Sequence, residues 1–314
     1  MNTKNLELLS IVIPVFNNAE SIRGLVDEIV EVVASLSPSV ELELILIDDG
    51  STDDSWLTLS DLAVAYPKVV RAIKLTRNFG QLAAMVAGWE HANGAAVINM
   101  SADLQDPPSA IPSFVGRWRD GFDVVVGVRQ DRRDGIIARF TSGVAHKLLK
   151  GSNPRFPETW FDFTLMSKRN LEVVISMAGR HRFAQGDIFH AGFNYASVPY
   201  IRAKRPFGRS GYNFWKRLAN FTDATLDSSY SLIQFFIRIG ILFSISSVLY
   251  AIWIVIARLT GLIPSTGWAP LMVVILLCSG LIMSMLGIIA EYLWRIYDST
   301  RGKPMYVVDL EVNG

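Results

Sequence analysis

The stretch "LSIVIPVFNNAESIRGLVDEIVEVVASL", residues 9–36, decides the fold class. Its first part is a short apolar run that predicts a buried strand, and Pro14 fits the end or edge of such a strand. Its second part repeats apolar residues at helical spacing, from Ile22 through Ile29 to Leu36, and predicts an amphipathic helix. A buried strand that leads directly into a helix is typical of α/β proteins.

The same alternation continues along the first half of the chain. Further strands are predicted at residues 41–48, 69–76, 95–100 and 122–129, and further helices at 52–66 and 80–93. Asp and Ser residues near the start of the 52–66 helix suit capping, and Gly94 suits the end of the next helix. Strands that alternate with helices predict a mostly parallel sheet with helices on both faces.

Polar clusters follow the first four predicted strands. They occupy residues 17–20, 48–54, 77–81 and 101–106. Each cluster alone is ordinary turn chemistry. Because ligands of such sheets bind beyond the carboxyl ends of the strands, the four clusters together predict one binding crevice.

Composition narrows the function classes. The 314 residues carry a formal net charge of +1, which gives no field that would attract nucleic acid. The single cysteine, Cys278, excludes an intramolecular disulfide. The apolar run at residues 11–16 is too short for a secretory signal, so we expect the first part of the chain to be cytoplasmic.

Two uncharged apolar segments, residues 239–257 and 271–290, are each long enough to cross a bilayer. Buried core helices are the alternative, although core helices of this length rarely lack a charged face. The connector between them carries only Arg258, whereas several basic residues flank the outer ends. The positive-inside rule therefore predicts a hairpin with both chain termini in the cytoplasm.

These features define four predicted regions. They are a catalytic domain at 1–212, interfacial helices at 213–238, a transmembrane hairpin at 239–290 and a cytoplasmic tail at 291–314. Ordinary soluble helices are the alternative for the second region. Small residues such as Gly280 and Gly287 favour helix packing into a homo-oligomer, for example a tetramer.

Several motifs carry a resemblance to a known family. They are "SIVIPVFNNAESI" (10–22), "IDDGSTDDS" (47–55), "LTRNFGQLAAMVAG" (75–88), "SADLQDPPSAI" (101–111), "FDFTLMSKR" (161–169), "VPYIRAKRPFGRSGYNFWKRL" (198–218) and "LGIIAEYLWRIYDSTRGKPMYVV" (286–308). With them the chain resembles the family 2 glycosyltransferases of the Rossmann-like GT-A fold. More narrowly, it is similar to the polyprenyl-phosphate hexose synthases, the group of bactoprenol glucosyltransferase and dolichol-phosphate mannose synthase.

The resemblance implies an inverting transfer from a UDP- or GDP-linked sugar to a polyprenyl phosphate such as undecaprenyl phosphate, at the inner membrane. The residues it assigns to the nucleotide sugar are Pro14, Phe16, Glu20, Asp48, Asp49, Arg77, Gly80, Ser101 and Gln105. It also implies Mg²⁺ or Mn²⁺ beside Asp103 and Gln105. These hard ions take oxygen ligands and stabilise charge on a departing diphosphate.

The metal motif departs from the family at its first residue. Relatives usually begin it Asp-Ala-Asp, whereas this chain has Ser101, a neutral and weaker ligand. We read Asp103 and Gln105 as strand-like neighbours facing one side, with Pro107 ending the strand. We expect activity with weaker metal affinity in the absence of donor. A harmless cap at Ser101 and a decayed site are the alternatives.

The acceptor side is predicted from arginines and one further aspartate. Asp162 matches the family's proposed base or acceptor-orienting residue, although Phe161 replaces the usual glycine. A helix cap before residues 164–177 is the alternative for Asp162. By position in the resemblance, the lipid phosphate is assigned to Arg129, Arg139, Ser142 and Arg205.

Two other functions remain open at this stage. One is transfer to a lipid-linked glycan or polysaccharide instead of a lipid phosphate. The other is a non-catalytic membrane subunit that binds a nucleotide sugar and scaffolds another protein.

Overall fold

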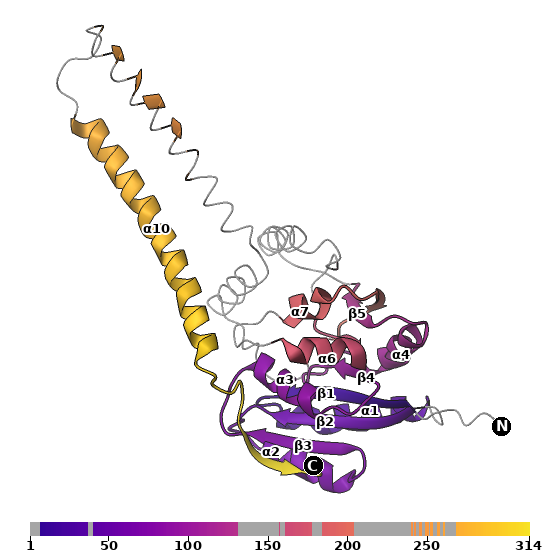
Figure 1. The fold of residues 1–314 in the computed structure, drawn as a ribbon. Helices are drawn as coiled ribbons and strands as arrows, with labels where there is room; N and C mark the ends of the chain where they lie inside the picture. The colour runs from indigo at the N-terminus through magenta and orange to yellow at the C-terminus, as the bar shows by residue number, and fades with distance from the viewer. Residues whose placement is uncertain are drawn as a thin grey trace.

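The computed structural model describes residues 7–36, 40–130, 157, 161–177, 184–203 and 268–314, with isolated positions between 240 and 260. Within these ranges the chain forms one eight-stranded sheet with the order β7-β5-β6-β4-β1-β2-β3-β8. Helices flank the sheet, and one long helix, α10, extends away from it (Figure 1).

The strands are β1 (Glu7–Val15), β2 (Val40–Asp48), β3 (Val70–Leu75), β4 (Ala96–Asn99), β5 (Val124–Arg129), β6 (Thr164–Ser167), β7 (Tyr195–Tyr200) and β8 (Val308–Val312). The helices are α1 (Ala19–Ala34), α2 (Ser55–Ala65), α3 (Gln81–His91), η1 (Pro108–Ala110), α4 (Ile111–Arg119), α6 (Lys168–Ser176), α7 (Ala184–His190) and α10 (Trp268–Thr300). All five predicted strands and all three predicted helices of the first 130 residues are confirmed.

The sheet is mostly parallel, as predicted. Strands β1 to β4 pair in parallel, and so do β5 and β7. The antiparallel members are β6, which lies between β4 and β5, and β8, which lies at the edge beside β3. Sequence reasoning did not find β6, β7 or β8.

Helices cover both faces of the sheet because side chains alternate along each strand. Residues Leu9, Ile11 and Ile13 of β1 enter one core cluster, together with the apolar faces of α1, α2 and α4. Val12 points to the other face and joins a cluster that includes residues of α3, α6 and α7. This two-layer burial makes β1 the centre of the domain.

The local predictions for proline, glycine and caps have different outcomes. Pro14 lies past Val12, the last residue of β1 that pairs with β4, so it sits at a strand end as predicted. Gly94 does not cap α3, which has Ala92 as its C-cap. Instead, a side chain at Gly94 would place Cβ only 2.6 Å from the backbone nitrogen of Ser10. Asp54 is the N-cap residue of α2, but its side chain makes no capping bond.

The residues after α10 return to the sheet (Figure 1). Strand β8 pairs with β3, and the amide of Thr76 donates to the carbonyl of Val307 at 3.0 Å. The Tyr306 hydroxyl donates to the carboxylate of Glu90. The predicted separate tail therefore contributes a strand to the sheet.

Helix α10 is the one described helix that is long and apolar enough to cross a membrane, through its segment Cys278–Thr300. Many of its large apolar side chains are exposed, including Leu271, Ile282 and Leu286. The predicted span 271–290 lies within α10. The predicted helices at 213–238 and nearly all of the span 239–257 lie outside the described residues.

The tail's contribution to stability is testable with Tyr306→Ala. This change removes packing against the second core cluster and the hydrogen bond to Glu90. We expect it to lower the free energy of unfolding by about 2 kcal/mol, measured by denaturant unfolding. Asp309→Ala is the matched control, because Asp309 is exposed on the same tail. Equal stability of the two variants would contradict the role of Tyr306.

Candidate active site

Hydrogen bonds tie together the loops that follow β1 and β2. Asn17, with φ +53°, donates its amide to the Ser51 hydroxyl at 3.0 Å and accepts from the Thr52 amide at 2.9 Å. The intervening Gly50 has φ +66°, and a Cβ there would come within 2.4 Å of the Arg77 carbonyl carbon. The glycine therefore lets the loops after β2 and β3 approach closely.

The two aspartates at the end of β2 are both buried but differ in their partners. Asp49 accepts from the amides of Phe79 and Gly80, at 2.7 and 3.0 Å. Burial raises the pKa of Asp49, and those two bonds oppose the shift. Asp48 accepts from the Ser51 amide through Oδ1, whereas its buried Oδ2 has no hydrogen-bond partner. Asp49 thus holds the loop after β3 in place, whereas Oδ2 of Asp48 accepts no hydrogen bond in the described structure.

The "SADLQD" segment is a turn, so the strand-like reading of Asp103 and Gln105 is wrong. Strand β4 ends at Asn99, and Leu104 has a positive φ of 59°. The Gln105 amide donates to Oδ1 of Asp103 at 3.2 Å. Asp103 is thus oriented by its own turn rather than by an extended backbone.

Ser101 closes this turn. Its hydroxyl lies 2.5 Å from Oδ2 of Asp106 and 3.0 Å from Oδ1 of Asp103, and its amide also donates to Asp106. Asp106 is only 1% exposed, and burial raises its pKa. A carboxylate at position 101 would face two others, whereas the Ser101 hydroxyl can donate its one proton, with Asp106 as the nearer acceptor.

Beyond Asp106, polar contacts continue toward the predicted acceptor side. The Tyr200 hydroxyl donates to Oδ1 of Asp106 at 3.0 Å and accepts from Nε of Arg129 at 3.3 Å. The Arg129 guanidinium pairs with Oδ2 of Asp162 at 2.8 Å. Gln185 donates to the other oxygen of Asp162 at 3.3 Å. The structure therefore links the 101–106 turn and the Arg129–Asp162 pair through side chains.

Asp162 is not a helix cap. Strand β6 follows it, and α6 is capped by Ser167, whose hydroxyl accepts from the Asn170 amide at 3.3 Å. Phe161, where the family resemblance implies glycine, has no positive φ and is 2% exposed. Its ring packs against Phe189 at 5.5 Å, so the substitution fills the core without straining the backbone.

The remaining predicted site residues lie near the carboxyl ends of β1 and β3 or outside the residues that the structure describes. Pro14, Phe16 and Glu20 lie at the β1–α1 junction, and Phe16 is 43% exposed. Arg77 stacks over the ring of Phe79 at 4.0 Å. Arg139, Ser142 and Arg205 lie outside the described residues. The site roles of all these residues stay predictions.

Sequence reasoning placed Asp106 and Tyr200 within motifs but assigned no site role to Asp106, Tyr200 or Gln185. Asp106 directly precedes Pro107 in the sequence, but nothing in the sequence indicates that its side chain is buried. Tyr200 lies 94 residues from Asp106 along the chain. It falls within "VPYIRAKRPFGRSGYNFWKRL" (198–218), a motif that carries the family resemblance, but the motif alone does not mark it as a partner of Asp106.

The donor set around Asp103 fits a hard divalent cation. Among the described residues, no group of three or more His, Cys, Asp or Glu side chains could hold a metal ion. What the turn offers is the carboxylate of Asp103 with neutral oxygens from Ser101 and Gln105. Mg²⁺ is commonly held by one or two carboxylates, with substrate phosphates and waters as its other ligands.

Comparison with known proteins identifies the family. The family model "Glycosyl transferase family 2" matches residues 10–185. The chain belongs to this family. Its members are glycosyltransferases, and so is this protein.

Similar family members align over nearly their whole length. The chain is 35% identical over 305 residues to the bactoprenol glucosyl transferase of Shigella phage SfV, covering 96% of this chain and 98% of the relative. It is 34% identical over 302 residues to the prophage bactoprenol glucosyl transferase homolog of Escherichia coli K12, covering 96% and 98%.

Solved structures of similar fold support the GT-A fold. Glucosyl-3-phosphoglycerate synthase from Mycobacterium tuberculosis, bound to Mn²⁺ and UDP, aligns with a TM-score of 0.51 at 20% identity, covering 70% of this chain and 78% of that one. A mannosyltransferase from Pyrobaculum calidifontis with GDP-Man and Mn²⁺ gives 0.50 at 18% identity, covering 69% and 62%.

Ser101→Asp tests the electrostatics of the turn. The new carboxylate would face Asp103 and Asp106. We therefore expect the free energy of unfolding of the metal-free protein to fall by about 1–3 kcal/mol. Mn²⁺ should then raise the melting temperature of this variant more than that of wild type. Ser101→Asn, neutral and of similar volume, is the control. An equal Mn²⁺ response in all three proteins would refute this reading.

Proposed function

We propose that the protein transfers a sugar from a nucleoside-diphosphate donor to a polyprenyl phosphate at the membrane, with inversion at the anomeric carbon. The observation that carries the proposal is the polar network from Asp103 to the Arg129–Asp162 pair. It supports the proposal because it connects a carboxylate suited to a metal diphosphate with an arginine suited to a phosphate. The bactoprenol glucosyl transferases that align with nearly the whole chain favour a polyprenyl phosphate as acceptor.

The donor end is supported by Asp48 and Phe16. The buried and unpartnered Oδ2 of Asp48 can accept from an N–H of a base or a hydroxyl of a ribose. An unmatched buried acceptor is costly, so a ligand that donates to it gains affinity. The exposed ring of Phe16 offers an apolar surface near the same strand ends. Solved relatives of the same fold hold UDP or GDP-Man.

Asp103 and Gln105 would hold Mg²⁺ or Mn²⁺ against the diphosphate. When bound, such an ion neutralises the charge that develops on the departing diphosphate. Ser101 would contribute by fixing the orientation of Asp103, because its hydroxyl lies within hydrogen-bond distance of that carboxylate.

The acceptor end would use Arg129 and Asp162. Burial opposes the charge of Arg129, but its contacts with Tyr200 and Asp162 raise its pKa overall, so the side chain stays cationic. A phosphate monoester is already largely ionised at neutral pH and needs orientation more than deprotonation. One of its oxygens would bond to the anomeric carbon as the bond to the nucleoside diphosphate breaks. Asp162 would orient the acceptor through Arg129, and Arg139, Ser142 and Arg205 would add further phosphate contacts.

The tail supports a two-span topology. Because β8 pairs with β3, the carboxyl end of α10 would lie on the same side of a membrane as the sheet. A crossing by α10 therefore requires an odd number of crossings between Ala203 and Trp268. The uncharged segment at 239–257 would supply one. Basic residues at the outer ends of the hairpin favour the cytoplasm for the sheet. A homo-oligomer packed through the helices remains a proposal from the small residues alone.

Asp103→Asn tests the catalytic proposal. The amide keeps the shape but loses the charge that would hold the cation, so we expect nucleoside diphosphate release to fall at least 100-fold. The assay uses purified full-length protein, Mn²⁺, undecaprenyl phosphate and a panel of UDP- and GDP-sugars. Asp120→Asn is the control, because Asp120 is an exposed aspartate that pairs with Arg117. Undiminished turnover by Asp103→Asn would remove this carboxylate from the mechanism.

Single-cysteine labelling tests the topology. Cys278→Ser removes the only thiol, and cysteines are then introduced separately at Ser265 in the connector and Asp309 in the tail. A membrane-impermeant maleimide applied to intact cells should label the Ser265→Cys protein alone, and permeabilised cells should label both. Labelling of Asp309→Cys from outside would contradict the hairpin.

A further inference from the structure

Tyr200 stands at the centre of the site, although no site role was predicted for it from the sequence. It ends β7, where it lies opposite Arg129, the last residue of β5, in the parallel register. It is 5% exposed and its hydroxyl contacts both Asp106 and Arg129. A buried tyrosine hydroxyl usually has a hydrogen-bond partner, and this one has two.

The ring of Tyr200 is held from two sides. It packs edge-on against Phe163 with centroids 5.8 Å apart. A Cβ at Gly127 would lie 2.8 Å from its Cε1 atom, so the glycine leaves room for the ring. The hydroxyl therefore has little freedom to leave its position between Asp106 and Arg129.

The direction of the hydrogen bonds is fixed by proton count. Burial and the nearby charge of Asp106 raise the pKa of Tyr200 to about 12, so the phenol is protonated at neutral pH. It has one proton, which it donates to Asp106, and its oxygen accepts from Arg129. Arg129 thus donates from Nε to the Tyr200 hydroxyl and from a terminal nitrogen to Asp162. Its remaining N–H groups can donate to the phosphate of the acceptor substrate.

A second contact joins the same strand end to the metal turn. The amide of Ala203 donates to the carbonyl of Gln105 at 3.2 Å. The turn at 101–106 is therefore fastened to β7 both through Asp106 and through the backbone of Gln105. Movement of the strand end would move both the turn and Arg129.

We propose that Tyr200 and Asp106 are positioning residues that hold the donor turn and the acceptor arginine in one fixed relation. The inference rests on the proposed function. It adds that binding at the two ends of the site depends on a shared hydroxyl–carboxylate contact. Neither residue needs to touch substrate for this role.

Tyr200→Phe is the direct test, because it removes one oxygen and keeps the ring. Asp106 then loses a donor and Arg129 loses an acceptor. With full-length protein we expect kcat to fall about 10-fold or more and the KM for undecaprenyl phosphate to rise several-fold. The affinity for Mn²⁺ in the presence of UDP or GDP, read from the free Mn²⁺ signal in electron paramagnetic resonance, should fall at least 3-fold.

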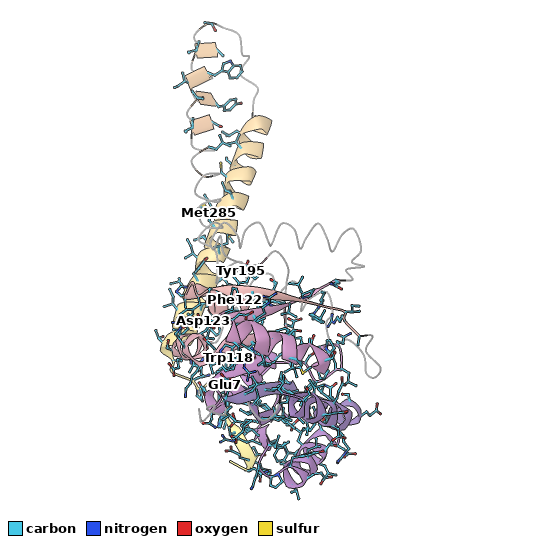
Figure 2. All side chains as sticks on the ribbon, turned by 90° about the vertical axis from the view of Figure 1, so that its right-hand side faces the viewer. Glu7, Trp118, Phe122, Asp123, Tyr195 and Met285 are labelled. Atoms are coloured by element: carbon cyan, nitrogen blue, oxygen red, sulfur yellow. The ribbon has the colours of Figure 1, made fainter. Side chains whose placement is uncertain are left out.

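Tyr195→Phe is the matched control on the same strand. Tyr195 lies at the opposite end of β7, where Figure 2 labels it near Phe122 and Asp123. Its ring packs on Phe189 at 5.2 Å. We expect this variant to keep wild-type kinetics and Mn²⁺ affinity.

Asp106→Asn distinguishes the contact of Asp106 with Ser101 from its contact with Tyr200. The amide oxygen can still accept from Tyr200, but the amide nitrogen would meet the Ser101 amide donor to donor. We expect Mn²⁺ affinity to fall while the KM for undecaprenyl phosphate stays closer to wild type. If Tyr200→Phe does not fold, Asp106→Asn still tests the positioning role proposed for Tyr200 and Asp106.

A double-mutant cycle excludes a merely structural role. If Tyr200 acts through Arg129, then Tyr200→Phe in an Arg129→Lys background should raise the acceptor KM little further. Additive effects on the acceptor KM, or Tyr200→Phe values within 2-fold of wild type, would overturn the proposal. The Mn²⁺ titration needs no turnover, so it judges this inference even if wild-type protein transfers no sugar.

Discussion

The buried carboxylate of Asp106 is the contact on which the geometry of the site depends. A carboxylate that is 1% exposed must find its donors within the protein, because unmatched buried polar groups are costly. Ser101 supplies two of these donors and Tyr200 the third. The first two close the turn that carries Asp103, and the third fixes the end of β7 beside Arg129. The departure from Asp-Ala-Asp at Ser101 is consistent with this arrangement, since a hydroxyl can satisfy Asp106 where a third carboxylate would repel it.

The sheet explains why loops so far apart in sequence can form one site. Parallel pairing of β1 with both β2 and β4 brings their carboxyl ends to one edge, and hydrogen bonds then join the loops in pairs. Asn17 links the first two, Asp49 links the second and third, and the Ser21 hydroxyl reaches the carbonyl of Ala102 at 2.9 Å. At the far edge, β8 attaches α10 to the strand that precedes Arg77. A membrane-crossing helix attached in this way would keep the donor loops near the lipid surface.

Periodicity in the first 130 residues was sufficient to predict five strands and three helices. It failed where the signal is short or tertiary. Strand β6 is four residues long, "TLMS", and reads as the start of the helix that follows it. The strand-like reading of Asp103 failed because the positive φ of Leu104 is invisible in sequence. Asp106 and Tyr200 could not be paired without knowing that β7 lies beside β5. Arg129 and Asp162 came from the family resemblance, and their ion pair came from the structure.

The central claim is that the turn held by Asp106 presents Asp103 to a metal-bound diphosphate. Its most direct test is a crystal structure of the full-length protein with Mn²⁺ and UDP or GDP, in which anomalous scattering locates the manganese. The account predicts a peak about 2 Å from a carboxylate oxygen of Asp103, with the diphosphate beside it and Asp106 still bonded to Ser101 and Tyr200. Manganese and diphosphate bound together away from this turn would contradict it.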